Sequence, residues 1–527
     1  MKTKRQYLCN ALLLTAVTLL MRTVSVSFNV YVSNRVGAEA MGLLSLVSGV
    51  YGFAVTLATS GIHLATVRTV SERLGQTHGA ENRKCLCACL AYASFFGALS
   101  SLLLFAFAAP IGLRLLSDAR TVRALRMLSF TLLPIALCSV MNGYFTAVRR
   151  AWKNALAQVA EQAIKITLTG YLLVIVAPKT VEGSLIAILL GGAVSESFSL
   201  FLNLVLYRFD KRRFSGVVQQ KGGGKVQVAK VALPVAVSAY MRSGLLTVEH
   251  ILIPRGLKAF GHGNSAALAA YGSLHSMALP VVLYPAAILS SFAALLIPEM
   301  TEQQTKQNNQ EIRYIAGRTY QLTLLFSVGV AGVMLCLSGE LGETLYHSAD
   351  VAYFIRRLAP LIPVMYLDTA TDAMLKGLGQ QVYSMNVNIL DAFVSVIAVW
   401  ILVPRLGING YLITIYITEL LNAALSVARL LRVTRYRPAV LRLVARPVAC
   451  VVGATCLLRL AVAFLLKFLP DGGWRLAVHI LFAALFYSAL LFATETLGKA
   501  DCRWLFRSVF PPREKKEKNR PRVVKKL

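Results

Sequence analysis

An arginine lies in the middle of the first long apolar run of the chain. Arg22 falls within residues 11–32, where a charged side chain costs several kcal/mol unless it faces a cavity or a partner. The same Met-Arg pair recurs at Arg242, again inside an apolar run, and Arg35 and Arg255 follow the two pairs at equal offsets. The repeated cation predicts a duplicated binding chamber.

Two further charges lie four positions apart in another apolar segment. Glu161 and Lys165 share one face of a predicted helix, so they can pair with each other, or both can face the chamber with Glu161 fixing the ammonium of Lys165. An offset of about 230 between the two halves of the chain aligns Glu161 with Asp391, in the manner of corresponding repeat positions.

The cations differ in the partners that the sequence offers them. Arg242 and Glu249 are seven positions apart on one helical face, which allows mutual pairing or a pairing with Arg22 across the chamber. Arg22 itself has no acid within four residues. A planar guanidinium suits phosphate oxygens. We therefore predict that Arg22, Lys165 and Arg242 bind substrate.

The acids inside apolar segments are candidates for coupling or for charge pairing. Glu196 follows the small residues Gly191 and Gly192, which allow close helix approach, so a structural hydrogen bond and a coupling role both remain open for it. The full set of coupling or charge-partner candidates is Glu161, Glu249, Asp391 and Glu196.

The composition places these charges in a membrane protein. The chain has 527 residues, of which 56% are hydrophobic and 15% charged, and a mean hydropathy of +0.62. Continuous apolar runs long enough to cross a bilayer recur along it, without the alternation of barrel strands. We predict an all-α integral membrane protein with about fourteen transmembrane helices, forming two pseudo-symmetric six-helix bundles plus two C-terminal helices.

The predicted organisation follows the basic and apolar segments. We expect an N-terminal half at 1–207, a basic cytoplasmic linker at 208–230, a C-terminal half at 231–435, two additional helices at 436–498 and a basic tail at 499–527. Of the 55 Lys and Arg residues, about 38 fall in segments that are cytoplasmic if both termini are inside, and about 13 fall in the opposite loops. The charge of +31 is therefore mainly an orientation signal and does not indicate nucleic-acid binding.

Several classes of function lack their sequence signatures. The chain has no zinc-protease, hydrolase-elbow or phosphate-loop motif and no long polar insertion. Cys85, Cys87 and Cys89 lack the spacing and histidine partners of a usual zinc site. We predict a monomeric, non-enzymatic membrane protein without a cofactor or metal centre.

Several stretches occur in the order typical of a known family. They are 37–42, 143–145, 158–162, 271–280, 358–368, 375–383, 388–391 and 403–411. In these the chain resembles the stage V sporulation protein B family of the multidrug, oligosaccharidyl-lipid and polysaccharide exporter superfamily, over roughly residues 7 to 435.

The resemblance implies a flippase that works by alternating access. Its substrate would be an undecaprenyl-pyrophosphate-linked glycan, a lipid II-like precursor moved from the inner to the outer leaflet for cell wall or spore cortex synthesis, with wall-synthesis proteins as possible partners. Arg22 matches a first-span arginine of the related lipid II flippase that is thought to meet the pyrophosphate, whereas Phe28 and Pro280 stand where that relative has further arginines. The alternatives are a cation-coupled multidrug antiporter, which needs acids to dominate the chamber, and a non-transporting scaffold, which needs no chamber.

Overall fold

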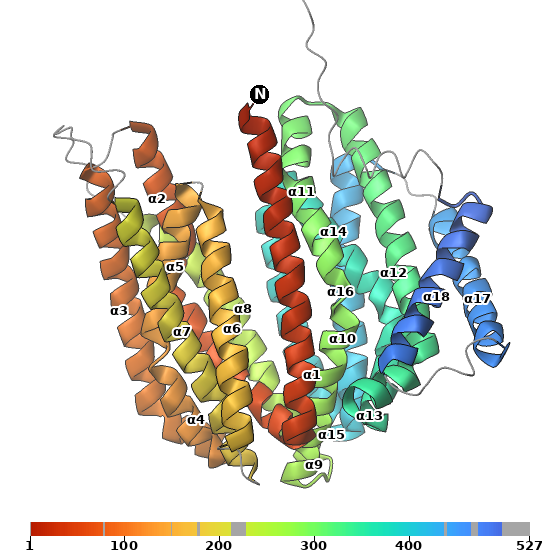
Figure 1. Ribbon diagram of the computed structural model, residues 1–527, viewed down its shortest axis with the longest axis horizontal. Helices are drawn as coiled ribbons and strands as arrows, with labels where there is room; N and C mark the ends of the chain where they lie inside the picture. The colour runs from red at the N-terminus through yellow and green to blue at the C-terminus, as the bar shows by residue number, and fades with distance from the viewer. Residues whose placement is uncertain are drawn as a thin grey trace, which may run out of the picture.

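The computed structural model describes residues 2–76, 80–148, 150–175, 180–211, 228–436, 440–464 and 473–497. Over these residues the regular secondary structure is helical throughout. Figure 1 shows long helices that lie side by side and run in roughly one direction, as expected of a membrane bundle. The predicted all-α membrane fold is confirmed.

The first helix reverses direction at a glycine. α1 spans Lys2–Thr59, and Gly37 breaks it with a φ of 80°, a conformation that side chains with a Cβ rarely adopt. The two arms of α1 correspond to the apolar runs predicted at 8–32 and 43–66. We call the end of the molecule that carries this break the Gly37 end, and the opposite end, where Asn308 lies, the Asn308 end.

The remaining helices before residue 212 follow the predicted spans. α2 (Ile62–Gln76) extends the second arm of α1 beyond Ser60 and Gly61, which both have positive φ. It is followed by α3 (Ala80–Pro110), η1 (Ile111–Leu115), α4 (Arg120–Ser129), α5 (Leu132–Ala147), α6 (Ala151–Ile175) and α7 (Val181–Lys211).

The predicted eighth span is broken into several pieces. After α8 (Val228–Ala259), the chain forms α9 (Asn264–Gly272), the π-helical segment η2 (Ser273–Ala278), α10 (Leu279–Leu283) and α11 (Ala286–Thr305). Pro280 and Pro285 lie where α10 begins and just before α11 begins. Proline cannot donate a backbone hydrogen bond, and this explains why the helix is interrupted here.

The last helices complete the second repeat and add a hairpin. They are α12 (Asn309–Tyr346), α13 (Ala349–Leu358), η3 (Ala359–Leu361), α14 (Ile362–Gly377), α15 (Gln381–Leu406), α16 (Ile408–Thr434), α17 (Val440–Phe464) and α18 (Gly473–Ala493). Figure 1 shows α17 and α18 beside α12 at one edge of the bundle. Most of the predicted linker at 208–230 and all of the predicted tail at 499–527 lie outside the described residues.

A repeated local structure accompanies the repeated sequence. The short helices α4 and α13 each follow a residue with positive φ, Ser117 (53°) and His347 (49°). A side-chain oxygen at the next position accepts a backbone hydrogen bond in both places, because Asp118 accepts one from the Arg120 amide and Ser348 accepts one from the Val351 amide. The same device at equivalent positions is consistent with duplication of the chain.

Nine helical stretches of the described residues are long and apolar enough to cross a membrane, three of them running through more than one helical segment, and the bent pair α4 and α5, at 42°, adds a tenth. α6 and α8 are not among these nine. α6 carries Glu161 and Lys165, and α8 carries Arg242 and Glu249. Since polar positions lower the mean hydropathy of a span, the charged helices are those in which function is to be sought.

Close helix packing at one glycine yields a stability prediction. A Cβ at Gly410 of α16 would lie 2.4 Å from the backbone oxygen of Leu402 in α15, whereas a Cβ at Gly339 of α12 would meet nothing within 4 Å. We expect Gly410→Ala to destabilise the protein by about 1–3 kcal/mol, because the backbones must separate. Gly339→Ala is the matched control, and it should leave the thermal unfolding midpoint in detergent unchanged or slightly raised. Equal midpoints for the two variants would contradict this packing.

Candidate functional site

Two cavities lie on opposite faces of the first arm of α1. One has a volume of about 540 Å³ and is bounded by α1, α2, α5, α6 and α7. The other has a volume of about 1060 Å³ and is bounded by α1, α10, α11, α12 and α18 together with neighbouring residues. We call them the polar chamber and the apolar groove. The first arm of α1 is therefore the wall between them.

The polar chamber is lined mainly by hydroxyl, amide and carboxyl side chains. Its lining residues are Met21, Ser25, His63, Ile135, Cys138, Ser139, Asn142, Asn154, Gln158, Glu161, Gln162, Glu196 and Ser199.

Some of these polar groups are already paired, and others are not. The Gln162 side-chain amide donates to Ser25 Oγ at 3.2 Å, and Asn154 Nδ2 donates to the Asn142 backbone oxygen at 3.0 Å. Asn154 Oδ1 is buried without a hydrogen-bond partner in the protein. A buried acceptor of this kind needs a donor from water or a ligand, so the chamber offers hydrogen bonding to a polar molecule.

The apolar groove has the opposite character. Its walls include Leu19, Val26, Ile288, Phe326 and Leu491. An apolar surface of this kind suits hydrocarbon, because removing apolar surface from water lowers the free energy. The helices that line the groove are long, so a hydrocarbon chain could lie along them.

The additional helix α18 is fixed in place as one wall of the groove. His479 Nδ1 lies 2.7 Å from Glu340 Oε2 of α12, and the Tyr487 hydroxyl donates to the Leu325 backbone oxygen at 2.8 Å. The groove therefore depends on α18, one of the two C-terminal helices that have no counterpart in the first repeat.

Arg22 lies between the two cavities. Its neighbour Met21 lines the polar chamber, and its other neighbour Thr23 lines the apolar groove. The Arg22 side chain is exposed, and its electrostatic influence reaches Tyr366 of α14. The structure thus places this predicted substrate-binding cation where a polar and an apolar compartment meet.

The predicted charges of the first repeat are brought together. Glu161 and Glu196 both line the polar chamber, on the neighbouring helices α6 and α7. Lys165 acts electrostatically on both carboxyl groups, and the Ser199 side chain hydrogen-bonds to Glu161. Lys165 itself is not among the lining residues, although it influences both acids that line the chamber.

The second repeat brings more acidic residues together in one group than the sequence analysis predicted. Arg242 of α8 acts electrostatically on Asp368 and Asp391, rather than pairing along its own helix with Glu249. Glu249 hydrogen-bonds with Ser395 and is influenced by Asp391. Arg242 therefore lies among carboxylates and is not an isolated cation like Arg22.

Two members of this acidic group had no predicted role. Asp368 accepts a hydrogen bond from Asn422 Nδ2 at 3.3 Å, and Glu419 of α16 is influenced by Asp368 and Asp391. Asp368 Oδ1 and Asp391 Oδ1 are buried and have no hydrogen-bond partner in the protein. Both residues were visible in the sequence as acids within apolar runs, but only the packing of α8, α14, α15 and α16 shows that they form one group.

Known proteins are similar to this chain in sequence and in fold. The Stage V sporulation protein B of Bacillus subtilis (strain 168) is 25% identical over 433 residues, which cover 80% of this chain and 83% of that protein. The Lipid II flippase MurJ of the same organism is 23% identical over 456 residues, 79% of this chain and 81% of that protein.

The fold and the family agree with the resemblance that the sequence indicated. A solved structure of the Lipid II flippase MurJ in an inward closed conformation covers 92% of this chain and 99% of its own, with a TM-score of 0.69 at 12% identity, which shows the shared fold. The model of the polysaccharide biosynthesis protein family matches residues 7–304, more than half of the chain. The chain is therefore a member of the polysaccharide biosynthesis protein family.

Proposed function

We propose that this protein is a flippase that moves an undecaprenyl-pyrophosphate-linked glycan, a lipid II-like precursor, from the inner to the outer leaflet by alternating access. The glycan occupies the polar chamber, the lipid tail lies in the apolar groove, and the phosphates meet Arg22 between them. The protein acts as a transporter without a chemical reaction, as a monomer, and it supplies wall-synthesis or spore cortex enzymes with their substrate.

One observation carries this proposal. Residues 21 and 23 flank Arg22 and line cavities of opposite polarity. A lipid-linked glycan has a polar head, an anionic linkage and a hydrocarbon tail in that order, and the site offers a polar cavity, a guanidinium and an apolar groove in the same order. Guanidinium binds phosphate oxygens in a bidentate manner.

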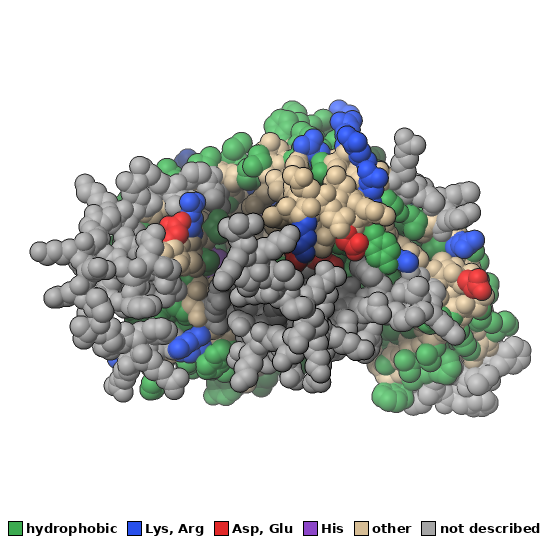
Figure 2. Space-filling view, turned by 90° about the horizontal axis from the view of Figure 1, so that it is seen from above, with side chains coloured by type: hydrophobic (Ala, Val, Ile, Leu, Met, Phe, Trp, Pro, Cys, Tyr) green, Lys and Arg blue, Asp and Glu red, His purple; other side chains and the backbone are tan. Residues whose placement is uncertain are grey.

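The orientation is part of the proposal. We place the Asn308 end, with both chain termini, in the cytoplasm, because cytoplasmic segments collect Lys and Arg. Figure 2 views this end, and basic side chains are spread over the described part of the face. The Gly37 end then faces outward.

The cavities also bear on the alternatives. A scaffold needs no chamber, so the two cavities beside α1 favour transport. A drug antiporter needs acids at the substrate site. The second repeat has such a group of acids, formed by Glu249, Asp368, Asp391 and Glu419. We assign this group to coupling, because Arg22 and the groove suit an anionic lipid.

The role of Arg22 can be tested by transport. We expect Arg22→Ala to slow the flipping of lipid II in proteoliposomes by about tenfold or more, because a hydrogen-bonded charge partner of the phosphates is lost. Arg22→Lys should retain part of the rate, since it keeps the charge but not the bidentate geometry. The control is Arg35→Ala, an exposed arginine of the same helix whose neighbours, unlike those of Arg22, line neither cavity. Equal rates for Arg22→Ala and Arg35→Ala would reject the proposal.

Lys165 and Arg242 complete the proposed set of substrate-binding cations. Because carboxylates surround both of them, we expect Lys165→Ala and Arg242→Ala to slow flipping less than Arg22→Ala does.

The groove makes a separate prediction. Ile288→Trp should obstruct the apolar groove, where residue 288 forms part of the wall, and should slow flipping of a long-chain lipid-linked glycan more than flipping of a short-chain analogue. Leu102→Trp, at an exposed leucine of α3, should affect neither. The same loss for both chain lengths would show that the groove does not hold the tail.

The acids of the second repeat, together with Glu161 and Glu196, are proposed to carry the coupling ion or proton. We expect Asp391→Asn to abolish the response of flipping to an imposed proton or sodium gradient, because an amide neither titrates nor carries charge. Asp350→Asn, at an exposed aspartate of α13, is the control. A gradient response that survives in Asp391→Asn would remove this residue from the coupling group.

A further inference from the structure

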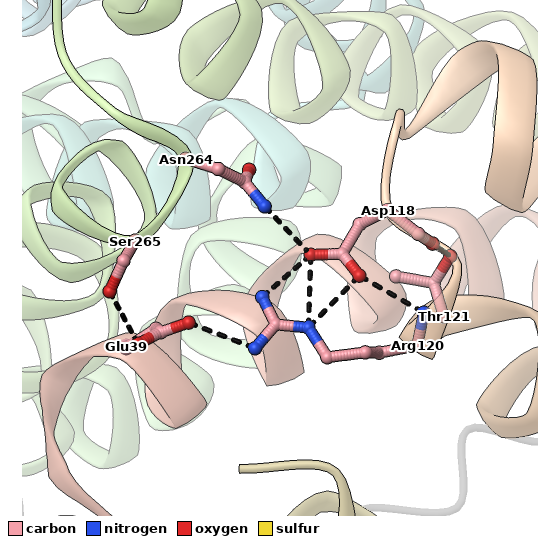
Figure 3. Close-up of polar contacts among 6 residues, drawn as sticks. All are labelled: Glu39, Asp118, Arg120, Thr121, Asn264 and Ser265. Carbon is pink, nitrogen blue, oxygen red and sulfur yellow. Dashed lines mark hydrogen bonds and ion pairs between the residues drawn. The ribbon is translucent and has the colours of Figure 1, made fainter.

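A hydrogen-bonded ion cluster joins three segments at the Gly37 end. It consists of Glu39, Asp118, Arg120, Asn264 and Ser265, and we call it the Arg120 cluster (Figure 3). Arg120 Nη1 lies 2.9 Å from Glu39 Oε1, and Arg120 Nη2 lies 2.7 Å from Asp118 Oδ2. One guanidinium thus holds two carboxylates.

Each carboxylate also has a second partner, from another part of the chain. Asn264 Nδ2 donates to Asp118 Oδ2 at 3.2 Å, and the Ser265 hydroxyl donates to Glu39 Oε2. Asn264 and Ser265 are the first two residues of α9, whose N-terminal amides favour negative charge nearby. The ion pairs of Arg120 therefore stay within the first repeat, whereas both neutral donors come from the second.

One carboxylate of the cluster is sheltered from solvent. The Asp118 side chain is only 4% exposed, whereas Asn264 and Ser265 are exposed. Burial by itself would raise the pKa of Asp118, but hydrogen bonds from Arg120 and Asn264 together hold it below its ordinary value of 3.8. Asp118 is thus ionised at neutral pH and strengthens its hydrogen bonds with Arg120 and Asn264.

Backbone packing beside the cluster closes the same end. A Cβ at Gly42 of α1 would lie 1.9 Å from the Leu268 backbone oxygen of α9, and one at Gly272 would lie 2.2 Å from the Ala38 backbone oxygen. α1 and α9 are therefore in backbone contact, which leaves no passage between them. Asn34 Nδ2 also donates to the Leu345 backbone oxygen of α12 at 2.7 Å.

Cations of α8 add to the contact between the repeats. Lys258 interacts electrostatically with Asp118, Arg255 and Arg120, and Arg255 donates to the Arg114 backbone oxygen of η1. The second repeat thus presents Lys258, Asn264 and Ser265 to the two carboxylates of the first.

We propose that the Arg120 cluster is a latch that holds the Gly37 end closed and opens between Arg120 and α9. On opening, Asn264 and Ser265 leave the carboxylates, while Arg120 remains paired with both. No carboxylate is then left without a cation, which would be the costly outcome in a sheltered site. The latch rests on the proposed function only in that transport requires this end to open.

The test measures opening directly and needs no substrate. Hydrogen–deuterium exchange of the full-length protein in lipid nanodiscs is compared for wild type, Asn264→Ala/Ser265→Ala, and Ser265→Thr. We expect the double variant to exchange about tenfold faster at residues 38–46 and 264–272, because two hydrogen bonds to charged groups are lost. Exchange at residues 309–320, at the Asn308 end, should stay unchanged. Ser265→Thr retains the hydroxyl and should behave as wild type.

The contrary outcomes are equally definite. Unchanged exchange at both segments of the Gly37 end overturns the latch, as does an increase that is uniform along the chain and accompanied by a lower unfolding temperature. Should the double variant not fold, Ser265→Ala alone must accelerate exchange at 38–46, and its failure to do so also overturns the proposal. Because exchange is measured without lipid II, these results are independent of whether Arg22→Ala impairs flipping.

Discussion

A charged side chain inside a bilayer must face water, a ligand or an opposite charge, and this constraint organises the structure. Arg22 satisfies it by lying beside two cavities, with the polar chamber on one side of its helix and the apolar groove on the other. Arg242 satisfies it differently, through Asp368 and Asp391. Repeated Met-Arg pairs have thus acquired two distinct environments, one open and one internally compensated.

The break at Gly37 makes the first of these environments possible. Val32, on the first arm of α1, packs in the hydrophobic core that includes α12, α13 and α14, whereas residues 43–58 of the second arm pack in the core with α3 and α5. Without a residue that tolerates a φ of 80°, one helix could not serve both cores. α1 would then be unable to stand as a wall between chamber and groove.

The sequence was sufficient for the fold and for part of the site. Apolar runs determine the spans, and Pro280 and Pro285 mark the broken eighth span, because these effects are local. The acidic group of the second repeat was not predictable as a group, since Asp368 and Glu419 come together only through the packing of α14 against α16. The sequence also could not show that residues 21 and 23 line different cavities, because that depends on neighbours from eight other helices.

The two repeats differ at the position that carries the Arg120 cluster. Asp118 and Ser348 occupy equivalent places, but the serine carries no charge for an arginine to hold. The latch engages α1 just beyond Gly37, on the same helix as Arg22.

Arg22 and the latch are joined by the continuous backbone of α1, which forms hydrogen bonds with both repeats. Gln162 donates to Ser25 from α6, and Asn29 donates to the Ser276 backbone oxygen of η2 at 3.2 Å. Arg22 lies on the arm of α1 that ends at Gly37, and Glu39 of the latch lies two residues after that glycine. The proposed substrate cation and the latch therefore lie on the same helix, so a movement of α1 would change both.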